Sequence, residues 1–317
     1  MKAVYVEKFG GPENLINGDI PQPQPGPGQA LVKIAATGVN FIDVYFRIGL
    51  YPATPPVVLG SEGAGTVEAV GPDVTNVRVG ERVAYAMARG SYAEYAVVPA
   101  WQLVKIPDSL DFQKAAAAML QGMTAHYLTH STYPLKSGDS CLIHAAAGGT
   151  GRLLVQMAKM RGARVTGTVG DEEKARQAKE AGADEVIIYT KEDFVAKVKG
   201  TMNVVYDSVG KSTFNQSLDC LRPRGMMVSY GNSSGPAPDV APLLLMQKGS
   251  LFLTRPSFAA YTSTQEELDR RAGDVLNWVA QGKLKLHIHK VYPLAEAAQA
   301  HRDLESRQTS GKLLLVP

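Results

Sequence analysis

The chain has 317 residues, of which 45% are hydrophobic and 20% charged, and this is the composition of a globular protein rather than a disordered or membrane-spanning one. At about 150 residues per domain, the length predicts two domains with separate cores. The 33 Lys and Arg residues against 30 Asp and Glu leave a net charge of +3, too small to predict nucleic acid or an anionic membrane as a partner.

The first residues, 1–8, have the pattern of a strand and lack the apolar core of a signal peptide. No run of about 18 apolar residues follows, so we expect a cytoplasmic protein that does not cross a membrane. The two cysteines, Cys141 and Cys220, lie far apart in apolar runs and have no CxxC spacing. We expect buried, reduced thiols rather than a disulfide or zinc ligands.

Residues 1–124 contain short strand-like runs interrupted by proline and glycine, a texture that predicts a compact, irregular β domain. From residue 125 onward, apolar runs of strand length alternate with helical patterns. The strands are expected at 141–145, 164–169, 185–189, 203–207, 225–230 and 251–254, and the helices at 150–161, 172–181 and 241–248, with shorter ones after Tyr189 and Gly210. This alternation predicts an α/β fold with a parallel, doubly wound sheet over residues 125–262.

The tail, residues 263–317, begins with a helix, continues with an alternating strand at 283–289 and ends with an apolar strand at 312–316. A last strand with no further sheet beside it is expected to rejoin the first domain. That domain would then comprise residues 1–124 and 263–317.

A glycine-rich turn follows the first strand of the α/β region. The string AAGGTG at 146–151 keeps the second and third glycines of GxGxxG as Gly148 and Gly151, and Ala146 replaces the first. Such glycines let the backbone approach a pyrophosphate, whose charge meets the N-terminus of the next helix. The position between a strand and a helix predicts a dinucleotide-binding loop.

The end of the second strand distinguishes the two nicotinamide dinucleotides, because NAD-binding proteins place a carboxylate there for the ribose 2′-hydroxyl. Here the position is Gly170, and Lys174 follows one helical turn later. The absence of that carboxylate and the presence of a nearby lysine favour the 2′-phosphate of NADPH, although the acidic residues 171–173 lie between Gly170 and Lys174. We therefore expect NADPH as the cofactor.

Two further patterns match catalytic motifs only in part. Residues 231–235 fit GxSxG, but a nucleophile elbow needs a helix directly after the serine, and Gly235 and Pro236 follow instead. Residues 210–212 resemble the end of a P-loop, but the glycine required five residues earlier is Val205. Hydrolase and ATPase functions are therefore disfavoured. Three histidines are expected to be structural, namely His126, His130 and His144, and two are expected to lie on a solvated strand face, namely His287 and His289.

Residues 38–52 (GVNFIDVYFRIGLYP) and 144–151 (HAAAGGTG) together form a specific pattern. It resembles the zinc-free quinone oxidoreductases, the zeta-crystallin-like branch of the medium-chain dehydrogenase/reductase superfamily. The similarity continues through residues 206–210, 229–235, 254–257 and 304–307. The resemblance implies a chaperonin-10-like (GroES-like) β domain, a Rossmann domain at 125–262 and usually a homodimer.

The zinc-dependent relatives carry a cysteine where Asn40 stands and a His-Glu pair where Ser61 and Glu62 stand, and they have a four-cysteine lobe. This chain lacks those ligands, so the resemblance implies chemistry without a metal. Quinones suit such a site because their rings accept reducing equivalents readily. The residues expected to donate hydrogen bonds to the substrate are Asn40, Tyr45 and Tyr51, with Arg47 as a further candidate. The alternative is that the tyrosines only pack within their loop.

The resemblance also implies cofactor contacts. They would involve Asn40, then Gly148, Gly149 and Thr150 at the pyrophosphate, Gly170, Lys174 and Tyr189 at the adenosine end, Ser208, Asn232 and Ser233 along the groove, and Arg307 near a phosphate.

The sequence leaves two other functions open. One is NADPH-dependent reduction of the activated double bond of a 2-alkenal or enone. The other is an NADPH-binding sensor or RNA-binding protein with little catalysis, against which the near-neutral charge argues. The expected partners are a quinone substrate and a second copy of the chain, which would pair along the apolar edge strand at 251–253.

Overall fold

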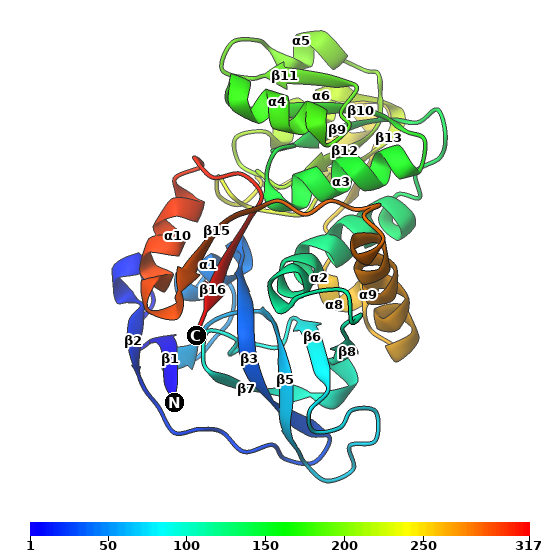
Figure 1. Ribbon diagram of the computed structural model, residues 1–317. Helices are drawn as coiled ribbons and strands as arrows, with labels where there is room; N and C mark the ends of the chain where they lie inside the picture. The colour runs from blue at the N-terminus through cyan, green and yellow to red at the C-terminus, as the bar shows by residue number, and fades with distance from the viewer. The chain divides into compact units, whose positions relative to one another are not determined.

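The computed structural model describes residues 1–317 and divides into two compact units (Figure 1). Unit 1 comprises Met1–Met123 and Thr262–Pro317, and unit 2 comprises Thr124–Tyr261. The chain therefore leaves unit 1, completes unit 2 and returns to unit 1.

Unit 1 is built around a seven-stranded sheet in which β3 has the central role. The strand order is β15-β16-β3-β5-β6-β8, and β7 also pairs with β3. The strands are β3 (Gln29–Val39), β5 (Glu62–Val70), β6 (Arg82–Ala86), β7 (Tyr95–Pro99), β8 (Val104–Lys105), β15 (Ile288–Pro293) and β16 (Lys312–Val316). A smaller antiparallel sheet has the order β2-β1-β4, with β1 at Lys2–Val6, β2 at Ile16–Asp19 and β4 at Val57–Val58. The β domain expected from the sequence is therefore present in unit 1.

The expectation that the last strand rejoins the first domain is confirmed. β16 pairs antiparallel with β3, with Leu314 opposite Gly38, and parallel with β15. The core beside these strands contains Leu313 and Leu315 of β16 together with Val39 of β3. The helices of unit 1 are α1 (Phe41–Arg47), most of α2 (Phe112–Tyr127), α9 (Gln265–Ala280) and α10 (Ala297–Glu305).

The expected strand at 283–289 is placed too early, because only its last two residues belong to an observed strand, β15. The amides of Lys283 and Leu284 donate to the carbonyl oxygen of Trp278, at 2.9 and 3.0 Å, and so close the end of α9 instead of pairing with a strand. The side chain of Leu284 is buried. The alternation of apolar residues therefore reflects one buried leucine after a helix, and strand β15 begins only at Ile288.

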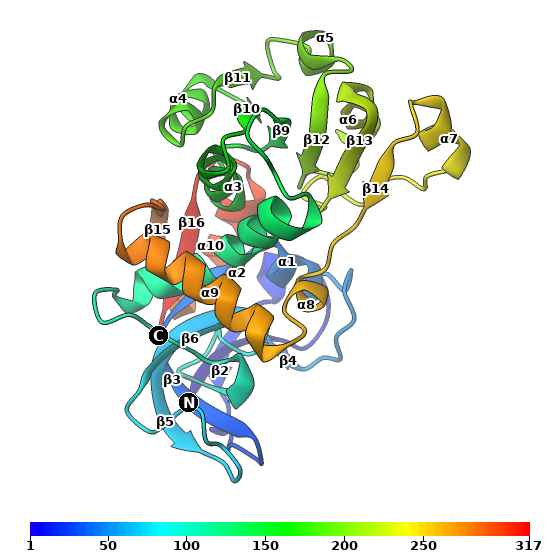
Figure 2. The same cartoon turned by 90° about the vertical axis from the view of Figure 1, so that its right-hand side faces the viewer.

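Unit 2 is a six-stranded parallel sheet with the order β11-β10-β9-β12-β13-β14 (Figure 2). The strands are β9 (Ser140–His144), β10 (Arg164–Val169), β11 (Glu185–Ile188), β12 (Met202–Asp207), β13 (Leu221–Ser229) and β14 (Phe252–Thr254). The order reverses between β9 and β12, which is the switch point where doubly wound sheets bind ligands. The expected Rossmann-like α/β fold is confirmed.

The helices of unit 2 are α3 (Gly149–Met160), α4 (Glu172–Glu180), α5 (Phe194–Val198), α6 (Phe214–Cys220), α7 (Pro242–Gln247) and α8 (Phe258–Tyr261), and α2 continues into a π-helix at Leu128–Thr132. Helix α3 packs on β9 and β10, and α4 packs on β10 and β11. Phe194, Phe214 and Leu218 of α5 and α6 join Leu142 and Val205 of the sheet in one buried cluster. None of the helices has the length and hydropathy needed to cross a bilayer.

Candidate functional site

The glycine-rich turn of unit 2 connects β9 to α3. Ala145 has a φ of 51°, which ends the strand at His144, and Gly148 precedes the first turn of α3 without any side-chain cap. The first amides of a helix have no partner within it. The turn therefore presents backbone donors at the positive end of a helix dipole, which is the arrangement that binds a phosphate.

Three small residues make this turn possible. A Cβ on Gly151 would lie 3.0 Å from both the Ala145 carbonyl carbon and Ala146 Cα, and still closer to the Ala145 oxygen. Ala146 stands where GxGxxG has its first glycine, and it fits because Gly167 on β10 lacks a side chain: a Cβ there would lie 2.7 Å from the methyl group of Ala146. The departure from the motif is thus compensated on the neighbouring strand.

A buried hydrogen-bond network lies beneath the turn, with His144 at its centre. His144 Nδ1 is 2.8 Å from Thr168 Oγ1 at the end of β10, and Nε2 is 2.9 Å from Ser217 Oγ on α6. Ser217 Oγ lies 3.1 Å from Asp207 Oδ2, and Asp207 Oδ1 accepts from the amides of Val209 and Gly210. The network links the carboxyl ends of β9, β10 and β12.

The protonation of this network follows from its acceptors. If Ser217 donates to the Asp207 carboxylate, His144 must donate to Ser217 through Nε2 and accept from Thr168 at Nδ1. Burial lowers the pKa of His144, which agrees with a neutral ring. As expected from the sequence, His144 is a buried histidine with both ring nitrogens hydrogen-bonded, and it ties the turn to neighbouring strand ends.

The adenosine end of the expected cofactor site lies between β10 and α4. A Cβ on Gly170 would lie 2.9 Å from the Tyr189 hydroxyl oxygen, so these two expected contacts are neighbours. Lys174, in the first turn of α4, is 19% exposed and its Nζ lies 3.5 Å from Asp171 Oδ2. Thr190 donates to the Gly170 carbonyl oxygen at 2.8 Å and holds the two strand ends together.

The acidic run before Lys174 is paired within the fold. Asp171 caps α4 by accepting from the Lys174 amide at 2.8 Å, and Glu172 pairs with Lys191 at 2.7 Å. Glu173 accepts from Arg176 Nε at 3.1 Å, and Arg176 holds it further through its Nη2. These cations reduce the repulsion that the run would exert on a 2′-phosphate.

The groove residues lie at the ends of β12 and β13. The Ser233 amide donates to the Ser208 carbonyl oxygen at 3.2 Å, and a Cβ on Gly231 would lie 2.8 Å from Ser208 Cα. Arg255 donates to the Gly231 carbonyl oxygen at 3.1 Å and, in the favoured orientation of the Asn232 amide, also to Asn232. No helix follows Ser233, so the GxSxG string forms no nucleophile elbow.

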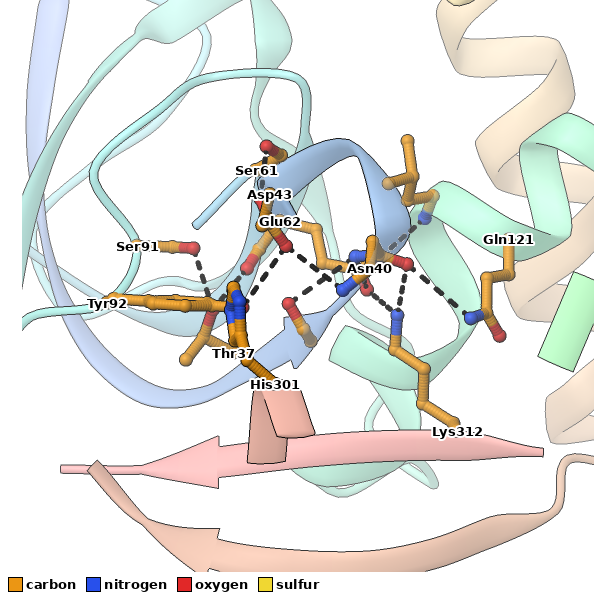
Figure 3. Close-up of polar contacts among 12 residues, drawn as sticks. Thr37, Asn40, Asp43, Ser61, Glu62, Ser91, Tyr92, Gln121, His301 and Lys312 are labelled. Atoms are coloured by element: carbon orange, nitrogen blue, oxygen red, sulfur yellow. Dashed lines mark hydrogen bonds and ion pairs between the residues drawn. The ribbon is translucent and has the colours of Figure 1, made fainter. Parts of the chain in front are cut away.

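Unit 1 contains a buried polar cluster around Asn40, at the end of β3 (Figure 3). Asn40 Oδ1 accepts from Lys312 Nζ at 2.8 Å, and Nδ2 donates to Glu62 Oε1 at 2.9 Å. Lys312 and Glu62 also form a direct ion pair, with side chains 3% and 0% exposed. The second oxygen of Glu62 accepts from the Leu120 amide at 2.6 Å.

Next to this cluster, Asp43 of α1 is fully buried. Its carboxylate accepts from Ser61 Oγ at 2.6 Å, from the Asn40 amide at 3.0 Å and from the Tyr92 hydroxyl at 3.2 Å. Burial raises the pKa of Asp43 to about 7, and the repulsion of Glu62 contributes in the same direction, while the hydrogen bonds lower it.

A chain of hydrogen bonds leads from Arg47 through His301 and Tyr92 to Asp43. In each bond, the donor is the group nearer to Arg47. Arg47 can only donate, so His301 Nδ1, 3.0 Å away, is an acceptor. His301 Nε2 then donates to the Tyr92 oxygen at 3.1 Å, which leaves the Tyr92 proton for Asp43. Burial lowers the pKa of His301 to about 3, with Arg47 adding to the effect, and the ring is therefore neutral.

Arg47 lies inside unit 1 rather than on its surface. Its side chain is 1% exposed, and its guanidinium donates to Glu305, to His301 and to the Gly10 carbonyl oxygen. These contacts hold α1 against α10 and engage all three guanidinium nitrogens. No pattern in the residues around Arg47 predicts this burial.

The two expected tyrosines belong to an aromatic group that continues from α1. The ring centroids of Tyr45 and Tyr51 lie 5.2 Å apart with an edge-on arrangement, and Phe46 meets Tyr51 in the same way at 5.9 Å. Tyr45 is buried, whereas Tyr51 is partly exposed. Arg307, the remaining expected contact, lies just beyond α10 with a φ of 60°.

Several side chains of these two networks escaped the sequence analysis. Asn40 was recognised, but its charged partners Glu62 and Lys312 were not, and neither were the residues that reach Asp43. The one available signal is a lysine at the first position of an apolar terminal strand, which also fits an exposed strand end. No group of three or more His, Cys, Asp and Glu side chains is arranged to hold a metal ion.

Comparison with known proteins finds two matching family models. Residues 26–108 match the alcohol dehydrogenase GroES-like domain, and residues 181–315 match a family described as zinc-binding dehydrogenase. A quinone oxidoreductase of Pseudomonas aeruginosa is 46% identical over 100% of this chain and 99% of its own length. A 2-haloacrylate reductase of a Burkholderia species is 43% identical over 99% and 98%.

Solved structures give the same picture. The crystal structure of Escherichia coli quinone oxidoreductase complexed with NADPH has a TM-score of 0.97 to this chain and 43% sequence identity, and the match covers 100% of both chains.

Proposed function

Because the chain belongs to the zeta-crystallin-like quinone oxidoreductases of the medium-chain dehydrogenase/reductase superfamily, we propose that it uses NADPH to reduce quinones without a metal. The observation that carries the proposal is the NADPH-complexed Escherichia coli relative, which matches the whole chain at a TM-score of 0.97. The fit of the phosphate-binding turn supports it independently, since only small residues allow α3 to approach the Ala145 carbonyl so closely.

In this proposal the backbone of unit 2 holds the dinucleotide. The first amides of α3, at Gly149 and Thr150, and the turn at Gly148 meet the pyrophosphate. Lys174 and Tyr189 lie beside Gly170 and meet the adenosine 2′-phosphate and ring. The remaining residues proposed to contact the dinucleotide are Ser208, Asn232, Ser233 and Arg307.

Unit 1 supplies the groups that orient the acceptor. Bound NADPH supplies a hydride or single electrons from its nicotinamide, and the quinone oxygens gain negative charge as they are reduced. Asn40, Tyr45 and Tyr51 donate hydrogen bonds to those oxygens, and Asn40 also contacts the nicotinamide. Arg47 contributes indirectly: its guanidinium is hydrogen-bonded to Glu305 and His301 and thereby holds α1 in place.

A second function has an observation in its favour. The Burkholderia relative named as a 2-haloacrylate reductase is nearly as similar as the quinone oxidoreductases, and its substrate is an activated carbon-carbon double bond. Such a bond also accepts hydride at a site without metal. This chain could therefore reduce a 2-alkenal, an enone or a haloacrylate.

Steady-state turnover distinguishes the two functions. The purified chain is given NADPH with a panel of ortho- and para-quinones and, in parallel, with 2-alkenals, enones and 2-haloacrylates, each over a range of concentrations. We expect the highest kcat/KM with a quinone. Turnover of the activated alkenes alone would replace the quinone proposal with the second one, and NADPH binding without turnover of either class would contradict both.

We also propose a homodimer formed along β14. This strand is the edge of the six-stranded sheet, and Phe252 on it is 57% exposed, with Leu243 and Met246 of α7 exposed nearby in sequence. An uncovered apolar edge favours pairing with a second copy. Light scattering at micromolar concentration should give twice the mass of the chain, and Phe252→Lys should halve it. The use of NADPH and two buried reduced cysteines fit a cytoplasmic location.

A further inference from the structure

We propose that Lys312 is a positioning residue that fixes and polarises the side-chain amide of Asn40. The inference rests on the proposed function, in which Asn40 donates a hydrogen bond to the substrate. Lys312 lies on the last strand of the chain, and Asn40 follows β3, the strand with which it pairs. Figure 3 shows the lysine side chain extending from β16 toward the asparagine.

The orientation of the Asn40 amide is determined by charges on both of its sides. Oδ1 accepts from the Lys312 ammonium at 2.8 Å and from Gln121 Nε2 at 3.4 Å. Nδ2 donates to the Glu62 carboxylate at 2.9 Å. A rotated amide would place its NH2 group against an ammonium and its oxygen against a carboxylate, so only one orientation is stable.

The cluster fits because the backbone carries no side chain at Gly38. Gly38 lies two residues before Asn40, and a Cβ at this position would lie 2.6 Å from Lys312 Cε and even closer to Glu62 Oε1. All three polar side chains are buried. The ion pair, the amide and the glycine therefore form one packed unit rather than a chance contact.

The ammonium also changes the strength of the amide as a donor. A charge-assisted hydrogen bond to Oδ1 draws electron density toward oxygen and makes the two hydrogens on Nδ2 better donors, because linked hydrogen bonds reinforce each other in a low-dielectric interior. One hydrogen is held by Glu62. The other meets only the Gly38 carbonyl oxygen at 3.4 Å, a long contact that a substrate oxygen could replace.

Lys312 thus serves a reaction without touching its reactants. As the quinone oxygen gains charge, the Nδ2 hydrogen that Lys312 and Glu62 direct can bond to it more strongly than to a neutral carbonyl. The positive charge that supports this bond comes from β16, which is 272 residues beyond Asn40 along the chain.

The test removes both charges together. Lys312→Met with Glu62→Gln leaves no unpaired buried charge, which is the change such pairs tolerate best. The new amide at position 62 has only one oxygen, and this oxygen accepts from the Leu120 amide. Asn40 therefore loses both the ammonium at Oδ1 and the carboxylate at Nδ2 that orient its side chain. We expect NADPH affinity to change by less than about twofold and kcat with quinones to fall about tenfold or more. The fall should be larger for quinones of lower reduction potential, which need more stabilisation of the developing charge.

The matched control carries the same two substitutions at an exposed pair of unit 1. Lys105→Met with Glu81→Gln removes a 2.8 Å ion pair on the surface and should leave kcat unchanged. An Asn40→Ala background supplies the second control. If Lys312 acts through Asn40, the Lys312 and Glu62 changes should lower kcat by less than about twofold in that background.

Two kinetic results would overturn the inference: an unchanged kcat in the neutralised variant, or a full additional loss in the Asn40→Ala background. Activity of the unsubstituted chain with quinones is measured alongside, so failure of the proposed function is seen separately. If the Lys312→Met, Glu62→Gln variant does not fold, the side-chain amide resonances of the parent protein still test the inference. The side-chain amide resonances that vanish in Asn40→Ala should be shifted well away from those of solvent-exposed asparagines, and resonances at ordinary positions would contradict a polarised amide.

Discussion

Arg47 and Glu305, 258 residues apart in the sequence, form a two-fold ion pair in which Nη1 and Nη2 of the guanidinium each lie 2.8 Å from one carboxylate oxygen. Arg47 is 1% exposed and Glu305 is 33% exposed. The pair joins α1 to α10, so the helix that carries the expected substrate contacts is held by a helix from the other end of the chain.

Removing the carboxylate of this pair should leave a buried cation without its counter-ion. We expect Glu305→Ala to lower the free energy of unfolding by about 3 to 5 kcal/mol, measured by urea denaturation at neutral pH. Glu180→Ala, which breaks an exposed pair with Arg176 on α4, is the control and should cost about 0.5 kcal/mol. Equal losses in the two variants would mean that the buried pair contributes no more than a surface contact.

Asp43 gives the protein an unusual pH dependence. Its pKa is raised from an ordinary value of 3.8 to about 7, so between these values the folded state binds more protons than the unfolded state. The free energy of unfolding contributed by Asp43 therefore falls as the pH rises from about 4 to about 7 and is constant above that. His301 opposes this: its pKa is lowered to about 3, and its contribution rises with pH up to about 6.5.

A substitution separates the two effects. Relative to the parent, Asp43→Asn should become more stable as the pH is raised from 4 to 7, by at least about 1.4 kcal/mol, the equivalent of one pKa unit. Urea denaturation at intervals across this range measures the difference. Asp19→Asn, at an exposed pair with Lys2 whose pKa is lowered, should show no such trend above about pH 4. A difference that stays level for Asp43→Asn would show that its carboxyl group is ionised throughout.

The parts of the fold that sequence analysis predicts well are those whose signal is local. The central strands of unit 2 are buried on both faces, so each appears as an apolar run, and β10 was located at its observed bounds, Arg164–Val169. The strand expected at 283–289 is placed too early, because the same alternation of apolar and polar residues occurs where a chain leaves a helix and buries one leucine. Only the hydrogen bonds to Trp278 distinguish the two.

The polar networks could not be predicted, because each depends on residues brought together by the fold. Lys312 and Glu62 are 250 residues apart, and nothing near either one indicates a buried partner. For Asn40, the family resemblance identified a site position but not the charges that hold its amide. A buried lysine and a solvated lysine look the same in sequence, and only the surrounding structure decides which one is present.

Lys174 is the residue expected to distinguish NADPH from NADH. A charge-assisted hydrogen bond to a phosphate contributes about 1.5 to 3 kcal/mol, so Lys174→Met should raise the Kd of NADPH roughly 10- to 100-fold and leave that of NADH nearly unchanged. Fluorescence titration at fixed ionic strength measures both values. Lys191→Met removes a cation that pairs with Glu172 on the same surface and should change either Kd less than about threefold. Equal weakening of both dinucleotides by Lys174→Met would assign the lysine a structural role.

Tyr45 and Tyr51 can either donate hydrogen bonds to the substrate or only pack against each other. In the first case, removing one hydroxyl should lower kcat about 2- to 10-fold and leave the Kd of NADPH unchanged. Tyr45→Phe and Tyr51→Phe keep the edge-on ring contact at 5.2 Å, so their kinetics report on the hydroxyl alone. Tyr5→Phe on β1 is the control and should have parental kcat. Parental kcat in all three variants would mean that both tyrosines only pack against their neighbours and do not donate to the substrate.

Gly151 should be the least replaceable glycine of the turn between β9 and α3, because α3 reaches the Ala145 backbone there with no space for a methyl group. We expect Gly151→Ala to displace the turn, to lower the free energy of unfolding by about 1 to 3 kcal/mol and to weaken NADPH binding at least tenfold. Gly273→Ala makes the same substitution inside α9, where no atom lies within 4 Å, and should stabilise the protein by about 0.5 to 1 kcal/mol with unchanged affinity. The comparison separates the loss of conformational freedom, which both variants share, from the steric conflict, which only Gly151→Ala introduces. Parental affinity in Gly151→Ala would show that the turn can widen without losing its phosphate site.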